Sequence, residues 1–267
     1  MRSLRSLWLI SSIGATDMRL EEFASKLRSS PKIVFFTGAG ISTESGVPDF
    51  RSPGGVWTKY QPVYFQDFVT SEAARIQHWQ LKKATYELYK KVQPNIGHNA
   101  IRDFEKRGHL LGLITQNIDG LHGIAGVSDD KIVELHGTDR LVTCLQCGKR
   151  FDPASVYENL GEQFTAPACD ACGGLLKSAN VSFGQQMPAE AMKRAQAWSE
   201  QAEIFIVIGS SLQVQPAASF PVIAKRSGAL LAIINRDETP LDDLADFIHH
   251  GAIGNFFTTL NPLLTDD

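Results

Sequence analysis

Short apolar runs alternate along this chain with longer stretches in which apolar residues recur every three or four positions. The apolar runs predict buried strands at residues 32–37, 110–115, 131–135, 181–183, 204–208 and 229–234. The helical spacing predicts helices at 20–28, 71–92 and 98–107, with another starting at Pro216 and amphipathic stretches at 241–248 and 251–260. Strands that alternate with helices predict an α/β fold with a doubly wound parallel sheet.

Polar clusters follow four of the predicted strands. They are Gly38-Ala39-Gly40, Gln116-Asn117-Ile118-Asp119, Gly209-Ser210-Ser211 and Asn235. Ligands of such sheets bind beyond the carboxyl ends of the strands, so the clusters predict a binding site at that edge.

The first cluster is similar to a dinucleotide-binding turn, in which glycines let the backbone approach a pyrophosphate at a helix N-terminus. Thr43 stands at the place of the third glycine, and no acid ends the second strand, so a plain strand-to-helix turn stays open. The amides and carboxylate of the second cluster suit hydrogen bonds to a ribose or a carboxamide, while helix capping by Asp119 is the alternative.

One of the seven histidines, His136, directly follows the predicted strand 131–135. A general base that works near neutral pH is usually a histidine. Its place at a strand end makes His136 the candidate base, although most histidines in a chain are ordinary surface or core residues.

All four cysteines of the chain lie in two Cys-x-x-Cys pairs, and a glycine follows each pair. Four thiolates at this spacing predict a closed tetrahedral zinc site that folds a small module and leaves no position for substrate. A redox dithiol or disulfides are the alternative. The predicted ligands are Cys144, Cys147, Cys169 and Cys172.

The composition is that of an ordinary globular protein, with 267 residues, 43% hydrophobic residues and a net charge of −3. The charge argues against direct nucleic-acid binding, and no apolar run is long enough for a membrane span. The cysteine pattern favours a reducing compartment, which predicts a cytoplasmic protein. Residues 1–17 are interpreted as a disordered or extended start, and a mitochondrial location would follow if they form a transit peptide.

Taken together, the motifs resemble those of the sirtuin family over about residues 20–260. The matching segments occur in sirtuin order at 38–51, 115–122, 134–137, the paired cysteines, 209–217 and 234–235. The resemblance implies a Rossmann-like NAD-binding domain and a small domain. We expect the large domain at 18–52, 93–140 and 179–267, a helical insertion at 53–92 and a zinc module at 141–178.

The resemblance also implies roles for single residues. His136 would be the catalytic base, and Val181, Phe183 and Gly184 would bind the acyl-lysine substrate. The cofactor NAD would contact Gly38, Ala39, Gly40, Asp49, Phe50, Arg51, Gln116, Asn117, Asp119, Gly209, Ser210, Ser211, Asn235 and Ile253.

The implied reaction is NAD-dependent removal of acyl groups from protein lysines. The acyl oxygen would be held against C1′ of the ribose, and His136 would deprotonate a ribose hydroxyl. The products would be the free lysine, nicotinamide and O-acyl-ADP-ribose. The alternatives are an ADP-ribosyltransferase or NAD hydrolase on the same scaffold, and a non-catalytic NAD sensor.

The chain departs from the family pattern in its substrate segment. Ala179, Asn180 and Gln185 replace two acids and an apolar residue, which bears on peptide preference more than on catalysis. Family members that remove acidic acyl groups carry a Tyr-x-x-Arg motif, where this chain has Gln80 and Lys83. We therefore expect an acetyl or another neutral acyl group on the substrate proteins.

Overall fold

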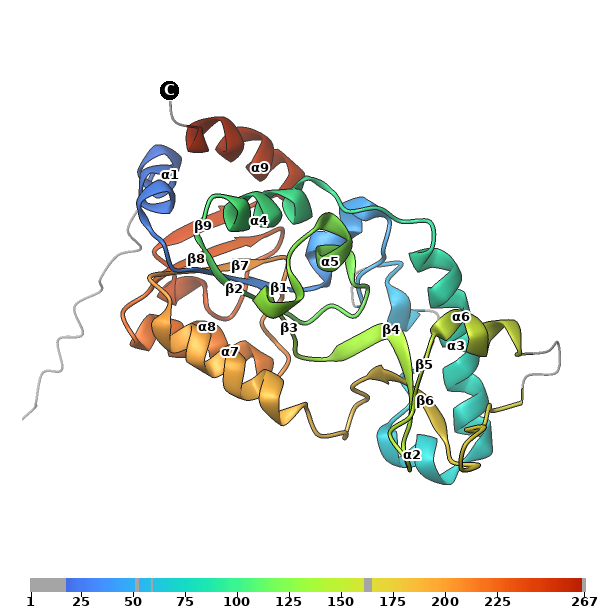
Figure 1. Ribbon diagram of the computed structural model, residues 1–267. Helices are drawn as coiled ribbons and strands as arrows, with labels where there is room; N and C mark the ends of the chain where they lie inside the picture. Colours follow the sequence, from blue (N-terminus) through green and yellow to red (C-terminus); the bar gives the residue numbers. More distant parts are fainter. Residues whose placement is uncertain (1–17, 51–52, 59, 161–164, 266–267) are drawn as a thin grey trace, which may run out of the picture.

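A six-stranded parallel sheet forms the larger part of the molecule, in the order β3-β2-β1-β7-β8-β9 (Figure 1). The computed structural model describes residues 18–50, 53–58, 60–160 and 165–265. The strands of this sheet are β1 (Ile33–Thr37), β2 (Leu110–Thr115), β3 (Ile132–Glu134), β7 (Ile204–Ile208), β8 (Leu230–Asn235) and β9 (Phe247–His250). The order confirms the predicted doubly wound, Rossmann-like fold.

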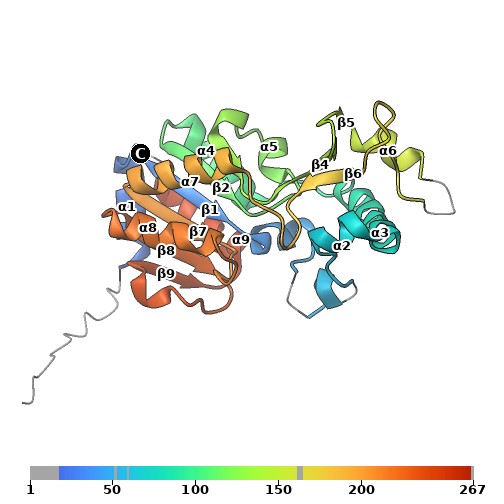
Figure 2. The ribbon, with the colours of Figure 1, turned by 90° about the horizontal axis from the view of Figure 1, so that it is seen from below.

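Helices cover both faces of this sheet (Figure 2). One face carries α1 (Leu20–Ser29), α4 (Ile96–Lys106) and α9 (Ile253–Leu260), and the other carries α7 (Ala189–Gln201) and α8 (Phe220–Arg226). The two central strands β1 and β7 are buried at every position, which explains why they read as continuous apolar runs.

The second unit contains a three-stranded antiparallel sheet in the order β5-β4-β6. Its elements are α2 (Phe65–Thr70), α3 (Glu72–Tyr89), β4 (Gly137–Cys144), β5 (Arg150–Phe151), α6 (Pro153–Glu158) and β6 (Leu176–Asn180). Trp79 and Tyr157 pack edge to face in its core, with ring centroids 5.8 Å apart. The domain limits expected near residues 140 and 178 fall inside β4 and β6. These limits stay predictions.

A buried ion pair joins α3 to β4 in this unit. Lys82 Nζ lies 2.8 Å and 2.7 Å from the two carboxylate oxygens of Asp139, and the side chains are only 7% and 5% exposed. A second lysine, Lys177, is buried nearby and donates to the carbonyl of Asn180. Burial and, to a smaller extent, the charge of Lys82 lower the pKa of Lys177 to about 7, and the charge of Asp139 opposes the change.

Three expectations about local structure need correction. Residues 181–183 are not a strand, because the β4–β6 ladder ends at the pair of Gly137 and Asn180 and the chain then turns. Helix α8 begins at Phe220 rather than at Pro216, after a 3₁₀ turn. In the amphipathic stretch 241–248 only the last residues belong to a strand, β9.

Helices α2, α5 (Leu121–Ala125), α6 and α7 were not predicted. Helix α7 buries fully only the small residues Ala195 and Ser199, so its sequence lacks a clear apolar period. Among the described residues, no helix is both long and apolar enough to cross a membrane.

Candidate functional site

The four polar clusters lie side by side at one edge of the large sheet. They follow the neighbouring strands β2, β1, β7 and β8, and the last residues of these strands are in register. Gln116 Nε2, after β2, donates to the hydroxyl of Ser210, after β7, at 2.8 Å. This bond crosses the end of β1, so the predicted clusters form one continuous surface where ligands of such sheets bind.

The glycines at this edge let two loops touch. Gly40 N donates to the carbonyl of Gly209 at 2.8 Å, and a Cβ on Gly40 would lie 2.8 Å from the Cα of Gly209. Gly209 itself has a φ of +61°. The helix that follows Gly38 is a 3₁₀ helix, Ala39–Ser45, rather than an α-helix. Close loop packing thus requires the glycines, and a pyrophosphate contact at this turn stays a prediction.

Asp119 and Asn117 are buried and tied to the 3₁₀ helix. Asp119 accepts hydrogen bonds from the Ser42 hydroxyl at 2.8 Å and from Leu121 N at 2.9 Å, directly before α5. Asn117 Nδ2 donates to the carbonyl of Gly38 at 3.1 Å. Burial raises the pKa of Asp119, and both of its hydrogen bonds oppose that rise. The loop after β2 is therefore fixed in place, which suits a polar binding surface.

His136 is held in the orientation that a general base needs. Its Nδ1 lies 2.9 Å from the backbone carbonyl of Gln116, which can only accept a hydrogen bond. Nδ1 therefore carries the proton, and Nε2 is left as the basic atom. Burial lowers the pKa of His136, and the bond to Gln116 opposes this effect, so the ring is neutral near pH 7.

The predicted substrate segment runs between His136 and the helical insertion. Val181 N donates to the carbonyl of His136 at 2.8 Å, and Phe65 N of α2 donates to the carbonyl of Phe183 at 2.9 Å. The Phe183 side chain is 41% exposed and lies against Tyr64. Gly184 follows with a φ of +80°, a conformation that favours glycine.

Several other predicted NAD residues also lie within the described part of the chain. Asn235 ends β8 and donates to the carbonyl of Asp237 at 2.7 Å, while Ile253 is buried at the start of α9. Ser211 follows Ser210 after β7 and Ala39 opens the 3₁₀ helix. Asp49 and Phe50 lie in the loop beyond it, and Arg51 is outside the described residues.

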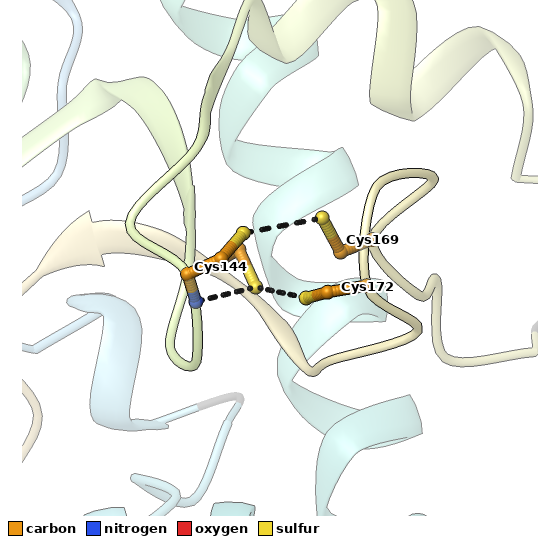
Figure 3. A group of neighbouring side chains, drawn as sticks. Cys144, Cys169 and Cys172 are labelled. Carbon is orange, nitrogen blue, oxygen red and sulfur yellow. Dashed lines mark hydrogen bonds between the residues drawn. The ribbon is translucent and has the colours of Figure 1, made fainter.

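The four cysteines come together as predicted. Their Sγ atoms all lie within 4.8 Å of one another, with Cys144 and Cys172 3.6 Å apart and Cys147 and Cys169 3.7 Å apart. Figure 3 shows sulfur atoms from the two turns facing one another. Tetrahedral zinc with Zn–S bonds of about 2.3 Å requires sulfurs roughly 3.8 Å apart. The set therefore fits one structural zinc ion, held by the two turns of the small unit.

Sequence reasoning missed the residues that support the loop after β1. Asn95 Nδ2 donates to the carbonyl of Ile41 at 2.7 Å, and its side-chain oxygen caps α4. His98 Nε2 lies 3.5 Å from the hydroxyl of Ser42. The asparagine at the predicted start of a helix was a capping signal, but its contact with residue 41 depends on the tertiary fold.

Comparisons with known proteins agree with this geometry. The family model described as "Sir2 family" matches residues 38–216. A protein of Rhodopseudomonas palustris named NAD-dependent protein deacetylase is 44% identical, over 92% of this chain and 96% of its own length. NAD-dependent protein deacetylase 1 of Bradyrhizobium diazoefficiens is also 44% identical, over 94% and 98%.

Solved structures of Sir2 proteins are also similar to this chain. A complex described as Sir2–p53 peptide–NAD⁺ has a TM-score of 0.83 at 37% identity, covering 92% of this chain and 98% of that one. A Sir2 protein bound to a propionylated peptide has a TM-score of 0.82 at 36% identity, covering 93% and 100%. By its motifs, its fold and these relatives, the chain belongs to the Sir2 family.

Proposed function

We propose that this protein uses NAD to remove acetyl or other neutral acyl groups from lysine side chains of proteins. The products are the free lysine, nicotinamide and O-acyl-ADP-ribose. Relatives of 44% identity over most of the chain carry the name NAD-dependent protein deacetylase, and a similar Sir2 structure holds both a peptide and NAD⁺.

The observation that carries the proposal is the environment of His136. Its Nδ1 is fixed by the carbonyl of Gln116, its Nε2 is basic, and its own carbonyl is bonded to Val181 of the substrate segment. A base and a substrate-pairing segment that share a backbone bond suit a reaction on a bound peptide. A hydrolase of NAD alone would have no use for that segment.

The residues of the sheet edge would bind different parts of NAD. NAD supplies a ribose carbon, C1′, from which nicotinamide departs. Asn117 and Asp119 would orient the nicotinamide end, because their side chains are held rigidly beside the loop after β1. Ser210 and Asn235 would hold the phosphate and adenine-ribose end, and His136 Nε2 would take a proton from a ribose hydroxyl.

The residues at the two positions that would recognise an acidic acyl group favour a neutral one. Lys83, at one of the two positions that would read an acidic acyl group, donates to the carbonyl of Leu160 at 3.3 Å. Gln80 is exposed and neutral.

We place the protein in the cytoplasm, since four thiolates on one zinc ion need a reducing compartment. Relatives from bacteria give no support to a mitochondrial location, and residues 1–17 lie outside the described residues.

The test is incubation of the protein with NAD and an acetyl-lysine peptide library, followed by mass spectrometry. We expect loss of acetyl from peptides together with O-acetyl-ADP-ribose, and loss of both products in His136→Ala. The matched control is His109→Ala, since His109 precedes β2 at the opposite end of the sheet and contacts only structural groups.

Two outcomes would contradict the proposal. Consumption of NAD without any acyl product would favour the ADP-ribosyltransferase or NAD hydrolase. Unchanged deacetylation in His136→Ala would remove His136 from the role of base.

A further inference from the structure

A cavity lies beside the loop after β2, and His136 is not among the residues that line it. It has a volume of about 300 Å³, at the small end of the range for small-molecule sites. Its wall includes residues of β3, α5 and β4 together with Asn117 and Asp119. Ala39, Ser42 and His136 are not part of it, so it shares only Asn117 and Asp119 with the predicted cofactor surface.

Opposite charges line this cavity without pairing. Glu134, Asp129 and Arg140 all line the wall, and Glu134 and Arg140 form no ion pair within 4 Å among the described residues. Burial raises the pKa of Glu134 to about 7, and the charge of Arg140 opposes that rise. Charged groups that line a shared cavity without forming an ion pair can bind complementary charged groups of a ligand.

The fold holds Arg140 in this position. Its Nη1 lies 3.5 Å from the carbonyl of Gly120, and its side chain lies against Gly120 and Gly123. A Cβ on Gly120 would lie 2.0 Å from Arg140 Cδ, so only glycine leaves space for the arginine.

A third polar group adds an independent sign of a ligand. His122 lines the cavity and is 3% exposed, and its Nδ1 is buried with no hydrogen-bond partner in the described part of the chain. Its Nε2 is bonded to the hydroxyl of Thr37, and burial lowers the pKa of the ring, so the ring is neutral. Buried polar atoms without a protein partner are normally satisfied by water or by a bound molecule.

We propose that this cavity is a second binding site, which takes a small zwitterion that carries an ammonium and a carboxylate group. The ammonium group faces Glu134 and Asp129, and the carboxylate faces the guanidinium of Arg140. A simple cation would leave Arg140 without a counter-charge, and a simple anion would meet two carboxyl groups.

The site is adjacent to the loop that carries Asn117 and Asp119. Asp139 N, next to Arg140, donates to the carbonyl of Ile118 at 3.0 Å and so joins β4 to that loop. Occupancy of the cavity therefore changes the affinity for NAD, and NAD changes the affinity for the zwitterion by the same factor.

The test uses the full, zinc-loaded chain and ligand-observed NMR, with no acyl peptide present, so its result does not depend on the proposed function. The probes are glycine, β-alanine and 4-aminobutanoate, each beside the amine and the carboxylate of equal length. We expect at least one zwitterion to bind at about 10 mM or below, and at least about tenfold more tightly than its two matched controls.

Binding should persist in saturating NAD and should fall at least about tenfold in Arg140→Gln and in Glu134→Gln. The matched controls are Arg226→Gln and Glu190→Gln, which replace exposed residues of α8 and α7. The proposal is overturned if none of the three zwitterions binds, if an amine or carboxylate alone binds as well, or if NAD displaces the probe completely.

Discussion

Removal of one member of the buried pair Lys82–Asp139 should unfold the protein far more readily than removal of an exposed charge. Both side chains are at most 7% exposed and share two short hydrogen bonds. Breaking such a pair leaves an uncompensated buried charge, which costs about 3–5 kcal/mol of unfolding free energy. The exposed pair Lys26–Glu22, 3.9 Å apart, is the control, and Lys26→Met should cost less than about 1 kcal/mol.

The two single variants, Lys82→Met and Asp139→Asn, should differ in unfolding free energy. In Lys82→Met, the carboxylate of Asp139 still faces Lys177, whose charge it favours. In Asp139→Asn, two buried lysines lose their counter-charge, so this variant should be the less stable of the two. Because Lys177 can release its proton near pH 7, the gap between the variants should be wider at pH 6 than at pH 8.

Urea denaturation of the zinc-loaded protein measures these differences, and the double variant closes the cycle. Adding Lys82→Met to Asp139→Asn should recover part of the lost stability, since it removes one of the two unpaired cations. The reasoning is refuted if Asp139→Asn costs less than about 1 kcal/mol, or if the second substitution deepens the loss.

Four further predictions concern pH, the base, the zinc and the loop packing. The folded pKa of Lys177 is about 7 and lies below its unfolded value, so the unfolded chain binds the extra proton above pH 7. Stability should then rise from pH 7 to 9 by up to about 1.4 kcal/mol per pH unit, and Lys177→Met should remove that rise in urea titrations. The pKa of His136 is lowered from its ordinary 6.5, so the acid limb of kcat/KM for deacetylation should be centred below pH 6.5, and a limb centred above 6.5 would contradict this. Cys147→Ser should release the zinc, measured by a chromogenic chelator, and melt the small unit while the large sheet keeps its circular dichroism. Gly209→Ala should raise the KM for NAD and lower stability by more than about 1 kcal/mol, because its Cβ would lie 2.4 Å from Ile41 N; an unchanged melting curve would speak against this packing.

Much of the large sheet was predictable because its strands are buried on both faces. The runs 110–115 and 204–208 match β2 and β7 residue for residue, since apolar content alone marks a central strand. Once those strands were placed, the carboxyl-edge rule brought Gln116, Gly209 and Asn235 to one surface. The four cysteines were predictable from spacing, because a metal site needs only the ligands in the right order.

Other features depend on contacts between distant parts of the chain. The pairing of Lys82 with Asp139 joins α3 to β4, and neither residue stands in a local pattern that marks it. The small sheet was hidden because its strands are short and interrupted by the zinc turns. The run at Val181 looked like a strand, but the β4–β6 ladder ends at Asn180.

The bond from Val181 N to the carbonyl of His136 has a consequence for engineering this enzyme. A change of backbone path in the substrate segment would shift His136 through this bond. Variants selected for a new peptide or acyl chain by reshaping residues near 181 should therefore lose turnover as they gain affinity. Helix α2 is joined to this segment by the bond from Phe65 N to Phe183 and by the ring contact of Tyr64 with Phe183. Libraries directed at α2 therefore offer a route to new specificity that leaves the imidazole in place.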